Sequence, residues 1–344
     1  MGEIMPKARI TIEDVARACH VSVATVSMVL SGKPGINALT RKRVASVAQT
    51  MGYQKRIRVS EKPLRRIAVV VDQTEDSEVV TSGFIYRLIA GTTEIIEKLR
   101  IQCEVEMVDR STFINDELSI IAQRQFDAVM VVAVEADREF NARLLDLGIP
   151  VVLVGVFSDT LYADAVQINH YSCMYDMVAH IISIGHQHIG MVGGQDSFIP
   201  NLRYRFHGFI HALTDHGLDA SHIEPCTRDV DDIRAATERL LDKFPEMTAI
   251  VCREDFVARV VLRVLKERNI AVPGRMTVTG FGDITASSDE DGLTTVQIDA
   301  HTMGMLAVSV MMNRLRVPAM MPITAVIHAP LCIRATSAPP MHTA

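Results

Sequence analysis

The sequence predicts an α/β protein with a small all-α helix-turn-helix module at its N-terminus and a two-lobed body of parallel sheets. Three observations support this prediction. The first 53 residues show three short helical patterns. From Ile67 onward, short β-branched runs alternate with amphipathic stretches, which is typical of parallel sheets covered by helices on both faces. This body extends over about 270 residues, which is long for one sheet and suits two lobes with a cleft between them.

The three N-terminal helices are predicted from their boundaries. Thr11 and Asp14 resemble a capping box at the start of the first helix. Ser22 is the N-cap candidate of the second helix, which ends at the segment SGKPG, and the third helix runs from about residue 37 to 51. Because only a turn separates the first two helices, the pair matches the motif whose second helix enters the major groove of DNA. The predicted core of this module consists of Val26, Val29, Leu30, Val44, Val47, Ala48 and Met51.

A basic linker over residues 54–66 follows the helices. The net charge of the chain is positive up to the end of this linker and negative after it. Residues 1–66 carry 13 Lys and Arg against four acidic residues, a net charge of +9. The rest carries 22 basic against 37 acidic residues, a net charge of −15. A basic module joined to an acidic body is expected of a chain whose small end binds a polyanion, either nucleic acid or a membrane surface.

Seven short apolar runs predict strands of the body, at residues 67–72, 102–108, 127–133, 149–155, 188–194, 248–252 and 276–281. We assign the first lobe to about 67–164 and 297–320, and the second lobe to about 165–296 and 321–336. Residues 337–344 are expected to form a frayed tail.

Composition excludes several classes of protein. The longest run without a polar residue, from Ile149 to Phe157, is about half of the ~20 residues that a membrane-spanning helix requires. The first twenty residues contain no apolar stretch typical of a secretion signal, so we expect a cytoplasmic protein that does not bind a membrane. The six cysteines are scattered without a C-x-x-C pair, which indicates reduced thiols and no thiolate zinc site.

The N-terminal segment TIEDVARACHVSVATVSMVLSGKPGINALTRKRVASVAQTMGY resembles the DNA-binding headpiece of the LacI/GalR family of transcriptional regulators. The segments GIPVVLVG, IGHQHIGMVGG, RFHGF, VPGRMTVTGFGD, LTTVQID and IRATS continue the likeness over nearly the whole chain. The resemblance implies a homodimer whose paired headpieces bind a near-palindromic operator in double-stranded DNA. It also implies a periplasmic-binding-protein-like body, in which a small-molecule effector enters the cleft and changes DNA affinity. Repression is the commoner outcome in the family.

The resemblance assigns DNA-contacting roles to residues of the headpiece. Short hydroxyl and amide side chains near the starts of the second and third helices suit phosphate contacts: Ser22, Thr25, Ser27, Asn37 and Thr40. Val23, Ala24 and Met28 occupy positions at which family members meet base edges, and none has a side-chain hydrogen-bond donor. We therefore expect readout through apolar contact with thymine methyl groups. Met28 departs from the Arg or His of many relatives, and His20 replaces their usual Gly in a turn, where a positive φ is expected.

The linker departs further from the family, which usually has a hinge helix here whose leucine wedges into the minor groove. Lys55, Arg56, Arg58 and Lys62 can contact phosphates, but Leu64 is the one remaining wedge candidate and follows a proline. We predict weaker central bending of the operator and a greater dependence of affinity on charge.

The effector site is expected at the carboxyl ends of the strands, in the loops after Val71, Val154, Gly193, Cys252 and Phe281. Arg205 in RFHGF matches the family's effector-gripping arginine, whose fork suits a carboxylate or a pair of hydroxyls. The other site candidates are Asp72, Glu254 and Asp255, of which the last two match the family's Asn-Asp pair.

Gly155 and Gly282 stand where sugar-binding relatives are expected to have aspartates. Loss of two such acceptors removes about 1.5 to 3 kcal/mol of hydrogen bonding each. That loss abolishes ordinary micromolar recognition of a neutral monosaccharide. We therefore expect an effector that is acidic, or larger than a neutral monosaccharide and less polar.

Several alternatives stay open at this point. The headpiece could be a helical protein-interaction module, and the body could be a ligand-binding protein of periplasmic type or belong to an orphan regulator without a ligand. An enzyme is not expected, because the sequence has no G-x-G-x-x-G after the first strand, no P-loop and no nucleophile elbow. Two histidine pairs, His207 with His211 and His186 with His188, lack a third ligand at suitable spacing. We expect no metal site and no cofactor.

Overall fold

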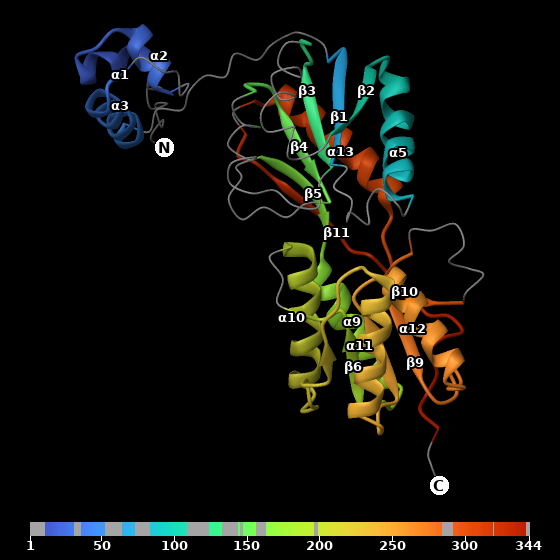
Figure 1. The fold of residues 1–344 in the computed structure, drawn as a ribbon. Coiled ribbons are helices and arrows are strands. Elements are labelled where there is room, and N and C mark those ends of the chain that lie inside the picture. The colour runs from blue at the N-terminus through green and yellow to red at the C-terminus, as the bar shows by residue number, and fades with distance from the viewer. Residues whose placement is uncertain are drawn as a thin grey trace, which may run out of the picture. The chain divides into compact units, whose positions relative to one another are not determined.

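The structure is a computed structural model that describes residues 11–30, 36–51, 64–72, 83–108, 124–132, 144, 147–155, 163–195, 199–283, 292–318 and 320–341. Its chain divides into two compact units. One unit comprises Met1–Lys62 with Arg314–Met321, and the other comprises Pro63–Asn313 with Pro322–Ala344. The first contains the helical headpiece and the second contains the α/β body (Figure 1).

The headpiece is a bundle of three helices: α1 (Ile12–Cys19), α2 (Val23–Leu30) and α3 (Ala38–Thr50). Local side-chain hydrogen bonds start α1, because Thr11 and Asp14 form the reciprocal capping box that the sequence predicts. His20 ends α1 with a φ of 49°, which confirms the expected left-handed turn. Of the predicted core, Val26, Val29, Val44 and Ala48 are buried, Val47 and Met51 are partly buried against them, and the Leu30 side chain lies outside the described residues.

The first lobe contains a six-stranded parallel sheet in the order β11-β5-β4-β3-β1-β2. Its strands are β1 (Arg66–Asp72), β2 (Gln102–Val108), β3 (Ala128–Val132), β4 (Val151–Val154), β5 (Asp164–Ile168) and β11 (Thr324–Ile327). Alternate residues of β1 enter different cores: Ile67, Val69 and Val71 pack in one, and Ala68 and Val70 in the other. A strand that is buried on both faces needs a continuous apolar run. This run is the reason that β1 can be predicted from the sequence.

The second lobe contains another six-stranded sheet, in the order β12-β10-β9-β8-β6-β7. Its strands are β6 (Ile189–Val192), β7 (Ile223–Glu224), β8 (Ala249–Cys252), β9 (Thr277–Gly282), β10 (Thr294–Gln297) and β12 (Leu331–Cys332), of which β12 alone pairs antiparallel. The described helices of the body are α5 (Phe84–Leu99), α9 (His170–Ser183), α10 (Pro200–Asp215), α11 (Val230–Lys243), α12 (Asp255–Glu267) and α13 (Ala300–Arg316), and Figure 1 shows them beside the two sheets.

The boundaries that the sequence assigned to the lobes were wrong by several residues. β5 pairs with β4, and β11 pairs with β5, so both strands belong to the first sheet. The chain therefore leaves the first lobe after Ile168, not at residue 164, and it leaves that lobe again after Ile327, not at residue 320.

The predicted tail also begins later than expected. Ser337 Oγ lies 2.7 Å from Thr294 Oγ1, and the Ala338 N–H donates to Thr277 Oγ1 over 3.2 Å. These bonds attach residues 337 and 338 to the edge of the second sheet. Among the described helices, none is long and apolar enough to span a bilayer.

Two glycines let α5 and α13 approach each other closely. A Cβ atom added at Gly91 would lie 2.0 Å from the His301 carbonyl oxygen, and one added at Gly304 would lie 2.2 Å from that of Leu88. Real Cβ atoms essentially never come so near to backbone atoms. The crossing of these two helices therefore requires residues without side chains at both positions.

Candidate DNA-binding surface and effector site

The start of α2 is fixed by a hydroxyl cap. Ser22 Oγ accepts a hydrogen bond from the Thr25 N–H over 3.0 Å and lies 2.8 Å from Thr25 Oγ1. This confirms Ser22 as the N-cap. The same two hydroxyls lie at the positive end of the helix dipole, where a phosphate is favoured.

The residues after this cap separate into a buried face and an exposed face. Val26 and Val29 are buried in the bundle, whereas Val23 is 40% exposed and Ala24 is also exposed. Ser27 and Met28 are partly buried. The first turn of α2 thus presents two small apolar side chains to solvent, beside the hydroxyls of its cap.

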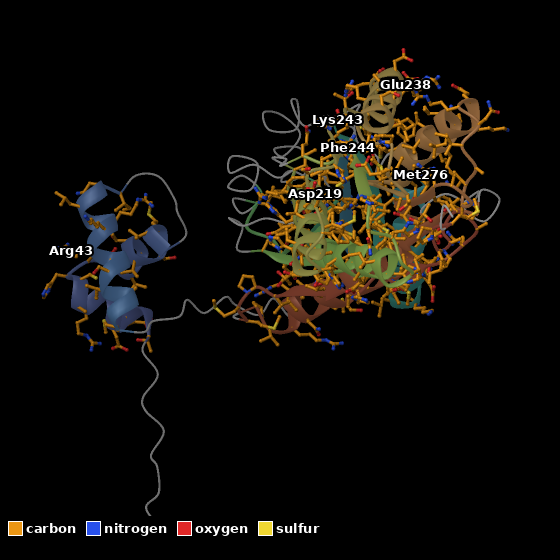
Figure 2. All side chains as sticks on the ribbon, turned by 90° about the horizontal axis from the view of Figure 1, so that it is seen from below. Arg43, Asp219, Glu238, Lys243, Phe244 and Met276 are labelled. Carbon is orange, nitrogen blue, oxygen red and sulfur yellow. The ribbon has the colours of Figure 1, made fainter. Side chains whose placement is uncertain are left out.

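The start of α3 repeats this arrangement. Asn37 is exposed, and its Oδ1 accepts a hydrogen bond from the Thr40 N–H over 2.7 Å, so Asn37 caps the helix. Lys42 and Arg43 are exposed on the same helix, and Figure 2 shows the Arg43 side chain extending away from the bundle. The headpiece therefore has polar caps at the starts of both α2 and α3, and it has exposed basic side chains on α3.

The structure gives Leu64 a place in the body. Its side chain is partly buried and packs against the core there, and the Arg65 and Arg66 N–H groups that follow both donate to the Asp127 carboxylate, over 2.9 and 3.0 Å. A side chain packed in this way is not available to wedge between base pairs, so the structure argues against the predicted role. Lys55, Arg56, Arg58 and Lys62 lie outside the described residues.

Arg205 lies at the centre of a buried cluster in the second lobe. It is 5% exposed, its Nε donates to His170 Nδ1 over 3.1 Å, and its NH1 donates to the Arg253 carbonyl oxygen over 2.7 Å. The guanidinium also covers the Phe281 ring, with Cζ 4.0 Å from the ring centroid. These contacts hold the charged group of α10 at the carboxyl ends of β8 and β9, the edge of the sheet at which the effector site is expected from the sequence.

Glu254 and Asp255 hold the second lobe together. Glu254 is 3% exposed and forms ion pairs with Arg228 at 3.1 Å and with Arg253 at 3.5 Å. Asp255 accepts hydrogen bonds from the Thr295 hydroxyl and the Asp283 N–H, each over 2.6 Å. Burial nevertheless raises the pKa of Asp255 above its ordinary value, because desolvation disfavours the charged form.

The two glycines at predicted aspartate positions differ in their surroundings. Gly155 has a φ of 71°, and its carbonyl oxygen accepts a hydrogen bond from Asn201 Nδ2 over 2.8 Å, which joins the end of β4 to the first turn of α10. Gly282 has a φ of 144°, and the next residue, Asp283, forms a bidentate ion pair with Arg334 at 2.9 and 2.8 Å. For Asp72 the structure describes the backbone alone, at the end of β1.

Sequence reasoning missed His170, Asn201 and Arg253. His170 is the first residue of α9 and follows β5, a strand that the apolar runs did not reveal. Asn201 lies one helical turn before Arg205 on α10. Arg253 extends beneath Gly193, where an added Cβ would lie 2.7 Å from its Cδ, and donates to the Cys226 and Thr227 carbonyl oxygens. A polar residue directly after an apolar strand is the signal that could have identified Arg253.

The histidine pairs show no metal-binding arrangement. His186 bonds to Thr248 Oγ1 and the Ala338 carbonyl oxygen, which ties it to the fold. His207 and His211 lie with their ring centroids 6.0 Å apart, and His211 Nδ1 lies 3.0 Å from the Tyr171 hydroxyl. The described part of the chain contains no group of three or more ligand-type side chains that could hold a metal ion.

Comparison with known families matches both parts of the chain. Residues 11–56 match the model described as "Bacterial regulatory proteins, lacI family". Residues 178–337 match the model described as "Periplasmic binding protein-like domain". The first match contains the three-helix bundle, and the second contains nearly the whole second lobe.

Two relatives resemble the chain over most of their length. The HTH-type transcriptional regulator MalR of Streptomyces coelicolor is 28% identical over 324 residues, which cover 88% of this chain and 90% of the relative. Catabolite control protein A of Priestia megaterium is 26% identical over 287 residues, which cover 81% of this chain and 84% of the relative. These relatives are transcriptional regulators, not enzymes.

Solved structures share the fold. The transcriptional regulator CelR in complex with cellobiose aligns with a TM-score of 0.69 and 22% identity, over 95% of this chain and 100% of that one. The lac repressor dimer bound to its operator and the anti-inducer ONPF aligns with a TM-score of 0.69 and 21% identity, over 96% of this chain and 99% of that one. A capped helix-turn-helix headpiece, a two-lobed parallel-sheet body and these matches agree: the chain is a DNA-binding transcriptional regulator with a lacI-family headpiece and a periplasmic-binding-protein-like body.

Proposed function

We propose that this regulator binds a near-palindromic operator as a homodimer and that α2 of each copy enters the major groove. The capped first turn of α2 carries this proposal, because it places exposed Val23 and Ala24 beside the Ser22 and Thr25 hydroxyls. The hydroxyls suit phosphate oxygens and the apolar side chains suit the floor of the groove. A two-fold dimer of such headpieces places its half-sites about one helical turn of DNA apart.

Sequence preference in this proposal comes mostly from contact between apolar side chains and thymine methyl groups. Val23 and Ala24 are exposed, and Met28 is partly exposed on the following turn of the same helix. None of the three can donate a hydrogen bond from its side chain. Half-sites rich in A·T pairs are therefore expected, and binding is expected to repress transcription in the cytoplasm.

The affinity for the operator is modulated by a small molecule that binds at Arg205 in the body. The buried guanidinium suits an acidic ligand, and the glycines at 155 and 282 leave no carboxylate at those positions to hold sugar hydroxyls. The ligand shifts the DNA-binding equilibrium only by its difference in affinity for the two states of the protein. We infer that the body binds this effector without converting it, so incubation with an effector identified by binding should leave that compound unchanged.

Selection of bound fragments from the source genome by the purified full-length protein tests the proposal. We expect a small set of fragments that share a near-palindromic sequence, with affinity that falls steeply as salt increases because phosphate contacts release counterions. Anisotropy titrations with one selected fragment would give the salt slope. If the protein prefers no double-stranded fragment at low ionic strength, with or without candidate metabolites, the proposal is wrong.

A further inference from the structure

The region around Arg205 contains a second polar group whose role the family resemblance does not assign. His170 lies at the N-terminus of α9, is 7% exposed, and stacks on Phe281 with their ring centroids 5.7 Å apart. Arg205 contacts the same aromatic ring. One phenyl ring, one imidazole and one guanidinium, from β9, α9 and α10, thus form a single packed group.

The tautomer of His170 follows from its hydrogen bond. Arg205 can only donate, so His170 Nδ1 must accept and cannot carry a proton. Burial and the nearby Arg205 charge both lower the pKa of His170 well below its ordinary value, so the ring is neutral. In the neutral ring the remaining proton lies on Nε2, which makes Nε2 a donor.

This Nε2 donor is open to a ligand. Within the described part of the chain, the His170 ring makes its one hydrogen bond through Nδ1. Nε2 has no partner there and is not among the buried side-chain atoms that lack one, so it is not fully buried. The group lies at the first residue of α9, where the helix dipole favours negative charge. A neutral donor, a guanidinium and a helix N-terminus together favour an oxyanion.

Asn201 adds an unsatisfied acceptor on the same side of α10. Its Nδ2 donates to the Gly155 carbonyl oxygen, which fixes the orientation of the amide, because the opposite orientation would set two oxygens against each other. Its Oδ1 is buried and lacks a hydrogen-bond partner among the described residues. Arg205 follows four residues later, on the same helix face. A buried acceptor of this kind requires a donor, which a ligand hydroxyl can supply.

Building on the proposed effector function, we infer that the effector is a polyhydroxy acid or a polyol phosphate. Its oxyanion accepts a hydrogen bond from the His170 Nε2–H, with the Arg205 charge on the other side of the imidazole ring, and one of its hydroxyls donates to Asn201 Oδ1. His170 is therefore a specificity-determining residue, which selects ligands that present an acceptor at Nε2.

Two experiments on the full-length protein test this inference. Nitrogen-15 histidine NMR of the free protein should show His170 protonated at Nε2 and unprotonated at Nδ1. Calorimetric titration with sugar acids, sugar phosphates and their neutral parent sugars, such as glucuronate, glucose 6-phosphate and glucose, identifies which compounds bind. Carboxylates and phosphates are separate arms of this panel, and binding in either arm with at least tenfold preference over the neutral parents supports the inference.

Two substitutions of His170 distinguish a direct contact between this residue and the ligand from a role in which it only positions Arg205. His170→Asn keeps an acceptor near the Nδ1 position but removes the Nε2 donor, whereas His170→Gln keeps a donor near Nε2 and removes the Nδ1 acceptor. If Nε2 contacts the oxyanion, His170→Asn weakens binding of the acidic ligand about tenfold or more, as expected for a hydrogen bond to a charged group, and His170→Gln weakens it less. Asn201→Leu should lower affinity for the hydroxyl-bearing acids more than for inorganic phosphate.

The inference is overturned by an Nδ1–H tautomer, by equal binding of neutral and acidic compounds, by no binding from the whole panel, or by a greater loss in His170→Gln than in His170→Asn. The selection of DNA fragments tests the proposed function and is independent of these binding measurements. A protein that binds its operator but no acid refutes this inference alone, and a protein that binds acids but no DNA refutes the proposed function alone.

Discussion

At the scale of single residues, the second lobe depends on buried polar groups that satisfy one another. Asp255 is 5% exposed and accepts from both the Thr295 hydroxyl and the Asp283 N–H. Asp283 in turn pairs with Arg334 and accepts a hydrogen bond from Gln297. These bonds connect α12, the end of β9 and the start of β10, so a change at one residue is expected to affect its neighbours.

Replacement of Thr295 by valine should destabilise the protein. The substitution keeps the size of the side chain but removes the hydroxyl that donates to Asp255 Oδ1. A buried carboxylate oxygen that loses its donor reduces the free energy of unfolding by about 1–3 kcal/mol. Urea unfolding of the two proteins measures the difference. Thr295→Ser retains the hydroxyl and serves as the matched control, and a Thr295→Val variant as stable as that control would refute the role of this bond.

His170 should make the folded protein less stable in mild acid. Its pKa is lowered by burial first and by the Arg205 charge second, so the folded protein resists protonation of the ring. Above about pH 6.5 the ring is neutral in both states and its contribution to stability is fully present. As the pH falls below that value, the unfolded chain takes up a proton that the folded chain does not, and the free energy of unfolding decreases by up to about 1.4 kcal/mol per pH unit.

The measurement is urea unfolding of the native protein and of His170→Asn between pH 7.5 and pH 5. The variant lacks the titrating ring, so its free energy of unfolding should decline less steeply over this range. Identical slopes for the two proteins would contradict the assignment.

At the scale of helices and strands, local signals explain what the sequence could predict. The caps of α1 and α2 join residues only three apart, so Thr11, Asp14 and Ser22 could be recognised without knowledge of the fold. The strands β3 and β4 and the interior of β1 are buried on both faces and have unbroken apolar sequences. Such features are determined within a few residues of the chain.

The sequence did not predict two strands that contain buried polar residues. β5 contains Asp164 and Gln167, and β10 contains Thr294 and Thr295, all of which are buried or nearly so. Their polar atoms find distant partners: Asp164 Oδ1 accepts from the Ile323 N–H, for example. A single sequence does not show these partners, so β5 was not predicted. Without β5, the predicted lobe boundary was wrong and His170 was not recognised as a site residue.

The contact of α5 with α13 should tolerate no added side chain. Gly304→Ala places a Cβ against the Leu88 carbonyl oxygen and Thr92, so the helices must separate. Overpacking of this kind destabilises by about 1–3 kcal/mol, part of which the better helix propensity of alanine offsets. Gly274→Ala is the control, because its Cβ would meet only ordinary van der Waals contacts. Thermal unfolding compares them, and equal midpoints would show that the crossing adjusts freely.

At the scale of the whole molecule, the chain combines a basic reader of DNA with an acidic body that responds to a ligand. Residues 1–66 carry a net charge of +9 and the remainder −15. The positive headpiece is attracted to DNA phosphates, and the negative charge of the body opposes unspecific adhesion to the same polyanion. Leu64 packs against the core of the body, which argues against its use as a wedge, and our proposal therefore assigns sequence preference mainly to α2.

The most direct test of this account replaces thymine by uracil, one position at a time, in a selected operator half-site. Uracil lacks only the methyl group, so its use removes the apolar contact with Val23, Ala24 or Met28 and leaves every hydrogen bond intact. Loss of one buried methyl is worth about 0.8 kcal/mol, or about fourfold in affinity. The account predicts such a loss at one or more thymines of each half-site, and that the loss disappears in a variant whose contacting side chain is shortened to glycine or alanine. Unchanged affinity at every substituted thymine would contradict the claim that α2 reads the major groove through apolar side chains.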